Sequence, residues 1–141
     1  MEAQIREPLH GTYRGYELLT APPPHSGVHV VEALNILENE ALGAARHYAS
    51  GGETLHFMAE TLRRVYADRT SFLADPRFEP VPVDGLMAKA FARSRFDDIN
   101  RSVADPKEYR KTSSGNPFAF QKEGARDASP RIPIPHLREP G

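Results

Sequence analysis

The strongest helix signal in the chain is the stretch SGGETLHFMAETLRRVYADRTSFLADP, residues 50–76. Its start has capping-box spacing, in which Ser50 caps the helix while Glu53 reaches back to the same turn. Asp75-Pro76 closes the pattern, because the residue before a proline is driven away from helical backbone angles. The sequence therefore predicts a helix that ends near 72–73. Its apolar residues recur at helical spacing: Leu55, Met58, Ala59, Leu62, Val65 and Tyr66.

A β-hairpin is predicted upstream of this helix, over residues 7–21. β-Favouring residues flank Arg14-Gly15, and Gly15 permits the positive φ that a tight turn needs. The run Pro22-Pro23-Pro24 ends the second strand, because proline cannot donate to a ladder.

Two further helices are predicted on either side of the central one. The first begins at Ser26, a good N-cap, and fades near Leu42-Gly43. The second is capped by Asp84. The inward-facing residues that we expect are Val30, Leu34 and Leu37 in the first helix, and Met87, Ala90 and Phe91 in the second. From about residue 104 the chain is expected to be irregular or extended, because it contains the run Ser113-Ser114-Gly115-Asn116-Pro117 and a proline-rich stretch from Pro130 to Pro140.

Composition and charge exclude several classes of function. The 141 residues suffice for one core of moderate size, and the formal net charge of -1 gives no electrostatic case for binding nucleic acid. The chain has no cysteine, which excludes disulfides and thiolate chemistry. No apolar run approaches the roughly twenty residues that a membrane span needs.

Two histidines stand four residues apart, which is the spacing of a metal-binding pair on a helix. These are His25 and His29, with Glu32 one turn further on. Ser26 stands where the zinc-protease motif has its glutamate, and no cysteine can complete a site. We therefore interpret the pair as polar residues at a helix start. We assign no metal ligand and expect no cofactor, although an independent metal-binding domain remains an alternative.

The serines are poor candidates for a catalytic nucleophile. Ser26 follows a strand and opens a helix, but Pro24 and Val28 stand where a nucleophile elbow has glycines. Ser113 and Ser114 have no paired base in the sequence. No catalytic residue is assigned.

Tyr66, Asp68 and Arg69 lie within one turn of the central helix. The carboxylate and guanidinium could orient a substrate carboxylate, or they could belong to a structural ion-pair network. We favour the network, because such pairs are common on helices. The neighbouring Arg63 and Arg64 are expected on a solvated face.

The predicted elements lack partners. A lone hairpin is marginal in water, and few strongly apolar faces are available to cover it. We therefore expect a fragment of a larger protein, mainly α with a β-hairpin. The larger sheet that the hairpin would join is expected in parts of that protein outside this sequence. Residues 1–103 form its folded part, and residues 104–141 form an irregular, proline-rich segment.

Three blocks in order resemble the γ-glutamyltranspeptidase family, in the C-terminal part of its large subunit. They are residues 11–17 with 22–27, residues 34–39, and residues 66–69 with 73–76 and 81–86. The resemblance covers roughly residues 7–100, and three blocks in order are more specific than any one of them.

This resemblance implies an αββα N-terminal-nucleophile hydrolase fold and a precursor that cuts itself into two subunits. The nucleophile is then the first threonine of the small subunit, activated by its own amine. That Thr-Thr-His-type motif is absent here, and the tail resembles the stretch just before the processing point. The expected function is a large-subunit fragment of a γ-glutamyl transferase or hydrolase acting on glutathione-type amides, inactive by itself.

The resemblance also sets the expected partners. They are the remaining large-subunit chain, the small subunit and a small γ-glutamyl substrate, without nucleic acid or a membrane span. It suggests a periplasmic or extracellular location, and no signal peptide is visible. Two alternatives stay open: a fragment of a related acylase, and a standalone interaction module that uses the helix stripe from Leu55 to Tyr66 as its partner surface.

Overall fold

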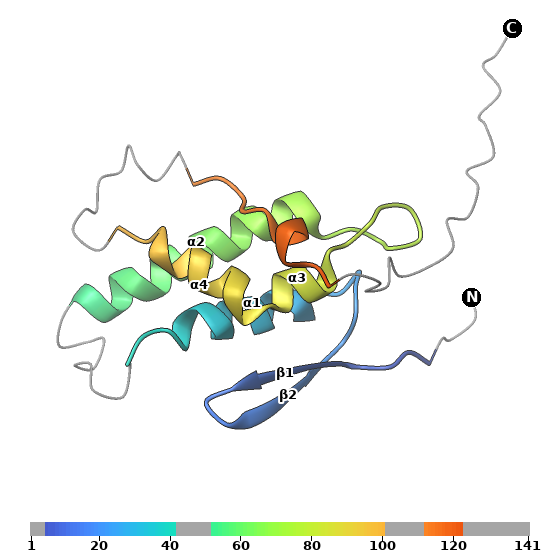
Figure 1. Ribbon diagram of the computed structural model, residues 1–141, viewed down its shortest axis with the longest axis horizontal. Helices are drawn as coiled ribbons and strands as arrows, with labels where there is room; N and C mark the ends of the chain where they lie inside the picture. Colours follow the sequence, from blue (N-terminus) through green and yellow to red (C-terminus); the bar gives the residue numbers. More distant parts are fainter. Residues whose placement is uncertain (1–4, 42–51, 101–111, 123–141) are drawn as a thin grey trace, which may run out of the picture.

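The structure is a computed structural model, and it describes residues 5–41, 52–100 and 112–122. A two-stranded hairpin is followed by helices that pack on one another (Figure 1). The elements are β1 Leu9–Tyr13, β2 Tyr16–Thr20, α1 Gly27–Leu37, α2 Gly52–Phe72, α3 Val83–Met87, α4 Lys89–Asp97 and the 3-10 helix η2 Pro117–Phe120. Among the described residues, none of the helices combines the length and the hydrophobicity that a membrane span requires.

The hairpin forms where the turn chemistry predicts it. Arg14 and Gly15 both have positive φ, 49° and 85°, which is the requirement of a two-residue type I′ turn. The strands pair antiparallel from Leu9↔Thr20 to Tyr13↔Tyr16. A β-carbon at Gly11 would lie 2.8 Å from Val31 Cγ1, so the glycine lets β1 approach α1 closely.

Helix α1 lies between the hairpin and the other helices and packs against α2, α3 and α4 (Figure 1). It begins after Ser26 as predicted, but the Ser26 side chain makes no capping bond. Instead, Ser26 Oγ accepts a hydrogen bond from Arg69 Nε at 3.1 Å. The predicted inward stripe was wrong at Val30, which is 58% exposed, because Val28 and Val31 occupy the buried face with polar neighbours.

Helix α2 ends at Phe72, as the Asp-Pro signal predicts, while the predicted cap Ser50 lies outside the described residues. Its apolar stripe faces outward: Leu55 is 56%, Leu62 57% and Tyr66 66% exposed, and only Val65 of the predicted set is buried. The buried face is largely polar and consists of Phe57, Glu60, Thr61, Arg64, Val65 and Asp68.

The predicted third helix is two helices, which break at Ala88 in extended conformation. Asp84 lies in the first turn of α3, and Pro82 occupies the N-cap position. Phe91 is fully buried as predicted, whereas Ala90 is exposed. Phe91 shares an apolar cluster with Val28, Val81 and Leu86. The second cluster consists of Ile36, Phe57, Val65, Ala92 and Ile99.

In the described part of the proline-rich segment, residues 112–116 have no regular structure and residues 117–120 form η2. η2 packs against α3, and Phe120 meets Phe91 with ring centroids 5.6 Å apart. The structure therefore confirms helices with one hairpin. The second sheet of an αββα fold is not seen among the described residues.

Candidate functional site

Four segments of the chain meet at the carboxylate of Asp68, which is 0% exposed on α2. Oδ2 accepts a hydrogen bond from Arg95 Nε of α4 at 2.8 Å. Oδ1 accepts one from the Gly115 backbone N–H at 2.6 Å. The third neighbour is Glu32 of α1, whose carboxyl lies close enough to Asp68 for a hydrogen bond between them to raise the pKa of Glu32. One buried carboxylate therefore ties α1, α2, α4 and the 112–116 segment together, and we call this set the Asp68 junction.

Glu32 takes part in the junction as a neutral acid. Burial, followed by its hydrogen bond to Asp68, raises the pKa of Glu32 to about 10. Two ionised carboxylates have no proton to share, so this bond needs the proton that Glu32 retains at neutral pH. Buried paired carboxyls of this kind act as a structural donor–acceptor pair when no solvent reaches them.

His29 extends the junction along α1. Its Nδ1 lies 2.8 Å from Glu32 Oε2, and both side chains are at least 97% buried. Burial, with a smaller effect from the positive Arg69, lowers the pKa of His29 to about 4. The neutral ring therefore donates from Nδ1 to Glu32, a tautomer that follows from this bond. His29 Nε2 is buried without a hydrogen-bond partner.

Arg95 links the Asp68 junction to the backbone of residues 112–116. Its Nη2 donates to the Ser113 carbonyl at 2.9 Å. Gly115 fits here because it has no side chain: a β-carbon would lie 2.7 Å from the Phe91 ring and 3.0 Å from Arg95 Cδ. The segment is thus held by charge on one side and by close packing on the other.

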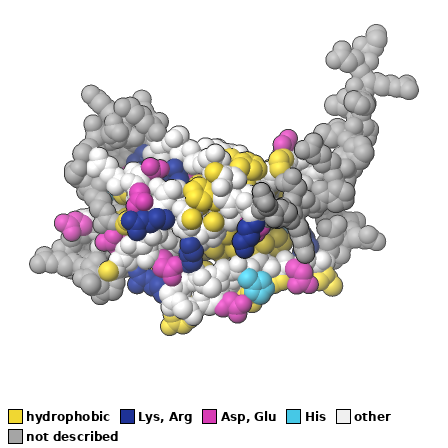
Figure 2. All heavy atoms as spheres, in the orientation of Figure 1, with side chains coloured by type: hydrophobic (Ala, Val, Ile, Leu, Met, Phe, Trp, Pro, Cys, Tyr) yellow, Lys and Arg dark blue, Asp and Glu magenta, His cyan; other side chains and the backbone are white. Residues whose placement is uncertain are grey.

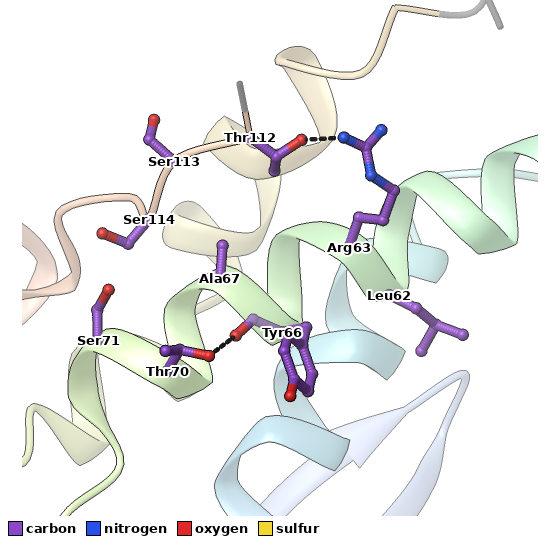
Figure 3. A pocket seen from close by; sticks show the side chains of 9 residues that line it. All are labelled: Leu62, Arg63, Tyr66, Ala67, Thr70, Ser71, Thr112, Ser113 and Ser114. Carbon is purple, nitrogen blue, oxygen red and sulfur yellow. Dashed lines mark hydrogen bonds between the residues drawn. The ribbon is translucent and has the colours of Figure 1, made fainter. Parts of the chain in front are cut away.

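An open groove of about 790 Å³ lies beside the junction, with α2 as one wall and the segment 112–114 as the other (Figure 3). Arg63 spans it by donating from Nη2 to Thr112 Oγ1 at 2.5 Å. Its described lining is hydroxyl-rich and holds no histidine or carboxylate: Leu62, Arg63, Tyr66, Ala67, Thr70, Ser71, Thr112, Ser113 and Ser114. A serine here therefore has no base beside it in the groove.

The surface of the helical part carries no charge patch of a single sign on the face shown in Figure 2. Basic and acidic side chains alternate there, with hydrophobic side chains between them. This agrees with a formal net charge of -1.

The structure separates the two histidines that the sequence pairs, and it buries one of the two arginines that were expected in solvent. His25 is exposed while His29 is buried, and the described residues contain no group of three or more metal-ligating side chains. Arg64 is only 8% exposed, so its predicted place on a solvated face was wrong. It donates to Glu60 Oε2 at 2.7 Å across one turn of α2.

The motif of Tyr66, Asp68 and Arg69 does not act as one unit. Asp68 points into the core, whereas Arg69 is exposed and lies over the Tyr66 ring. The ion-pair network exists, but the partner of Asp68 is Arg95 and not the adjacent Arg69. Sequence reasoning missed Arg95 and Gly115, since no local pattern links them to Asp68.

The sequence model described as Gamma-glutamyltranspeptidase matches residues 1–129, which is most of the chain. This chain belongs to the gamma-glutamyltranspeptidase family. The predicted resemblance is therefore confirmed, and the Asp68 junction lies within the matched part of this family member.

Relatives of this gamma-glutamyltranspeptidase family member are named as proenzymes. The chain is 43% identical over 107 residues to the Glutathione hydrolase proenzyme of Escherichia coli (strain K12), covering 74% of this chain and 18% of that protein. It is 45% identical over 93 residues to the Acylase ACY 1 proenzyme of Pseudomonas sp. (strain V22), covering 65% of this chain and 16% of that protein. The chain thus spans less than a fifth of these two relatives.

A solved structure of the same family agrees with the fold. The chain superimposes on gamma-glutamyltranspeptidase of Helicobacter pylori with a TM-score of 0.70 and 37% identity. The likeness covers 78% of this chain and 31% of that one.

Proposed function

We propose that this chain is the buttressing part of an amide-cleaving gamma-glutamyltranspeptidase-like enzyme. The catalytic nucleophile of that enzyme then lies in a part of the complete protein outside these 141 residues. The observation that carries the proposal is the Asp68 junction, which binds four segments together and in which Glu32, Asp68 and Arg95 are at most 4% exposed. It is built as a scaffold, because every charged group in it is already engaged.

The reaction that this proposal assigns to the complete protein is acyl transfer. A γ-glutamyl amide would be attacked by the nucleophile, and water or an amine would then release the acyl group. Its partners are the rest of the large subunit and the small subunit. This chain then supplies no catalytic side chain. In agreement, the described lining of the groove between α2 and residues 112–114 holds no histidine or carboxylate that could act as a base.

Two assays test the reaction class. The complete protein that contains this segment is assayed with γ-glutamyl p-nitroanilide and with glutaryl p-nitroanilide, which differ only in the α-amino group. We expect hydrolysis of the first and a much slower reaction of the second. The reverse preference would place the protein with the acylases, and inactivity toward both would sink the proposal.

The isolated 141-residue chain is the matched control. We expect it to cleave neither anilide and to lack a sharp thermal transition, because Leu55, Leu62 and Tyr66 on α2 are each more than half exposed to solvent. Turnover by the isolated chain would refute the assignment of catalysis to other chain.

The exposed stripe itself favours a second candidate function, a standalone interaction module. Leu55, Leu62 and Tyr66 are each more than half exposed on α2. In that case Leu62→Asp abolishes association of the isolated chain with its partner in a pull-down, while Glu79→Gln on an exposed loop leaves it intact. Unchanged association of the Leu62→Asp variant would rule this candidate out.

A further inference from the structure

The hairpin has two outer edges, and the structure distinguishes them. In an antiparallel pair, successive residues point their backbone N–H and C=O groups alternately toward the partner strand and away from it. Tyr13 and Tyr16 flank the two-residue turn and lie opposite each other, so their backbone groups bond to one another. Gly11 and Leu18, the next such pair, also bond between the strands.

The residues between these pairs point their backbone groups outward. On β1 they are His10 and Thr12, and on β2 they are Glu17 and Leu19. A contact from α4 agrees with this assignment, because the Thr12 carbonyl accepts a hydrogen bond from Lys89 Nζ at 2.7 Å. That carbonyl therefore points away from β2.

Lys89 closes the outer edge of β1. Its amine also pairs with Glu38, the residue after α1, and the other oxygen of Glu38 accepts from the Arg14 N–H at 2.5 Å. Helix α1 packs mainly on β1. Lysine amines blunt the edge strands of natural sheets, and an amine that occupies the Thr12 carbonyl opposes the addition of a strand on this side.

The outer edge of β2, which we call the β2 edge, is open. Among the residues that the structure describes, none forms a hydrogen bond with the outward backbone groups of Glu17 and Leu19. In Figure 1, β2 is the strand farther from the helices. The Leu19 side chain is 62% exposed. Unpaired backbone groups beside an exposed apolar side chain form a template for a further strand.

Resting on the scaffold role in the proposed function, we propose that the β2 edge takes up an extended strand from the part of the complete protein outside these 141 residues. This chain covers only 18% and 16% of two relatives, so a protein of their length has ample chain to supply the strand. The added strand bonds to the backbone of Glu17 and Leu19. It places an apolar residue beside Leu19, because side chains on neighbouring strands lie about 5 Å apart.

Hydrogen exchange of the complete protein, resolved to single amides, tests this joint. We expect the Glu17 and Leu19 amides to exchange at least roughly 100-fold more slowly than the His10 amide, because amides inside a sheet open only with the sheet. His10 is the matched reference, since its N–H points outward from the other strand. Exchange at Glu17 and Leu19 as fast as at His10 would overturn the inference.

Two proline variants identify what occupies the edge. Leu19→Pro removes an N–H from the β2 edge, and His10→Pro removes one from the residue directly opposite, on the closed edge. We expect Leu19→Pro to speed exchange at least roughly tenfold at Glu17 and in one segment outside these 141 residues. His10→Pro, which restricts the backbone in the same way, should leave both at wild-type rates.

The wild-type exchange rates decide the matter even if Leu19→Pro fails to fold. Edge protection that weakens on dilution would assign the edge to a second copy and overturn the inference. So would a folded Leu19→Pro variant that alters no segment outside this chain. Turnover of γ-glutamyl p-nitroanilide tests the proposed reaction separately: an inactive protein with protected edge amides would overturn that reaction while supporting the joint at β2.

Discussion

Arg95 of α4 donates from Nε to Asp68 Oδ2 of α2 over 2.8 Å, and neither side chain is more than 5% exposed. The two residues stand 27 positions apart in the sequence. This pair sits at the centre of a junction that Glu32, His29 and Gly115 complete.

Arg95→Met should destabilise the complete protein by about 3–5 kcal/mol, because it leaves Asp68 buried without its compensating charge. Chemical denaturation at pH 7 measures the change. The control is Arg93→Met, which breaks an exposed pair with Asp97 and should cost less than about 1 kcal/mol. Equal effects of the two variants would show that the buried pair carries no special weight.

Glu32→Gln should stabilise the protein at neutral pH. The pKa of Glu32 is raised from 4.5 to about 10, so the folded state must take up a proton that the unfolded state lacks at pH 7. That uptake costs about 3 kcal/mol over the 2.5 pH units between 4.5 and 7. Glutamine avoids it, since its amide can donate to Asp68 while its oxygen accepts from His29.

The gain from Glu32→Gln should vanish below pH 4.5, where the unfolded glutamate is protonated as well. Denaturation curves at pH 7 and pH 4 compare the variant with wild type, and Glu79→Gln serves as an exposed control. A gain of the same size at both pH values would contradict protonated Glu32.

The junction should give the wild-type protein a plateau of stability between pH 4.5 and 6.5. The raised pKa of Glu32 adds stability that is complete below pH 4.5 and is lost as pH rises toward 10. The lowered pKa of His29 adds stability that is complete above pH 6.5 and is lost as pH falls toward 4. Between these limits, folding moves one proton from histidine to glutamate with no net uptake, so the two slopes cancel.

This pH profile is measured by chemical denaturation at half-unit steps. In the Glu32→Gln variant, stability should still fall as the pH drops below 6.5, because the lowered pKa of His29 remains. This site should add no pH dependence above pH 6.5. If the variant still loses stability above pH 6.5 as steeply as wild type, other groups cause that loss.

Gly85→Ala should detach η2 from α3. A β-carbon at Gly85 would lie 2.0 Å from the Pro117 carbonyl oxygen, which is backbone and cannot swing aside. Hydrogen exchange at the Ala119 and Gln121 amides should rise by at least tenfold. Gly52→Ala, which has open space around it, should leave those amides protected; equal protection in both variants would disprove the close packing.

The hairpin and the helix ends could be predicted because their causes are local. Gly15 supplies the positive φ of the turn, and Pro76 stops the central helix, whatever the rest of the chain does. The family could also be predicted, since its three blocks are short and ordered along the sequence.

The helix faces could not be predicted because the buried faces are polar. Periodicity assigns Leu55 and Leu62 of α2 inward, whereas the structure buries Arg64 and Asp68. A buried charge is acceptable only with a partner, and the partner of Asp68 comes from α4. That pairing, like the Gly115 contact 47 residues away, depends on tertiary structure alone.

We propose that the catalytic nucleophile lies outside these 141 residues. The decisive measurement is to treat the complete protein with an electrophilic γ-glutamyl analogue and to locate the modified residue by peptide mass spectrometry. We expect one labelled residue, a threonine beyond this segment, and no label within it. A stoichiometric label on Ser113, Ser114 or any other residue of this chain, with loss of activity, would refute the assignment.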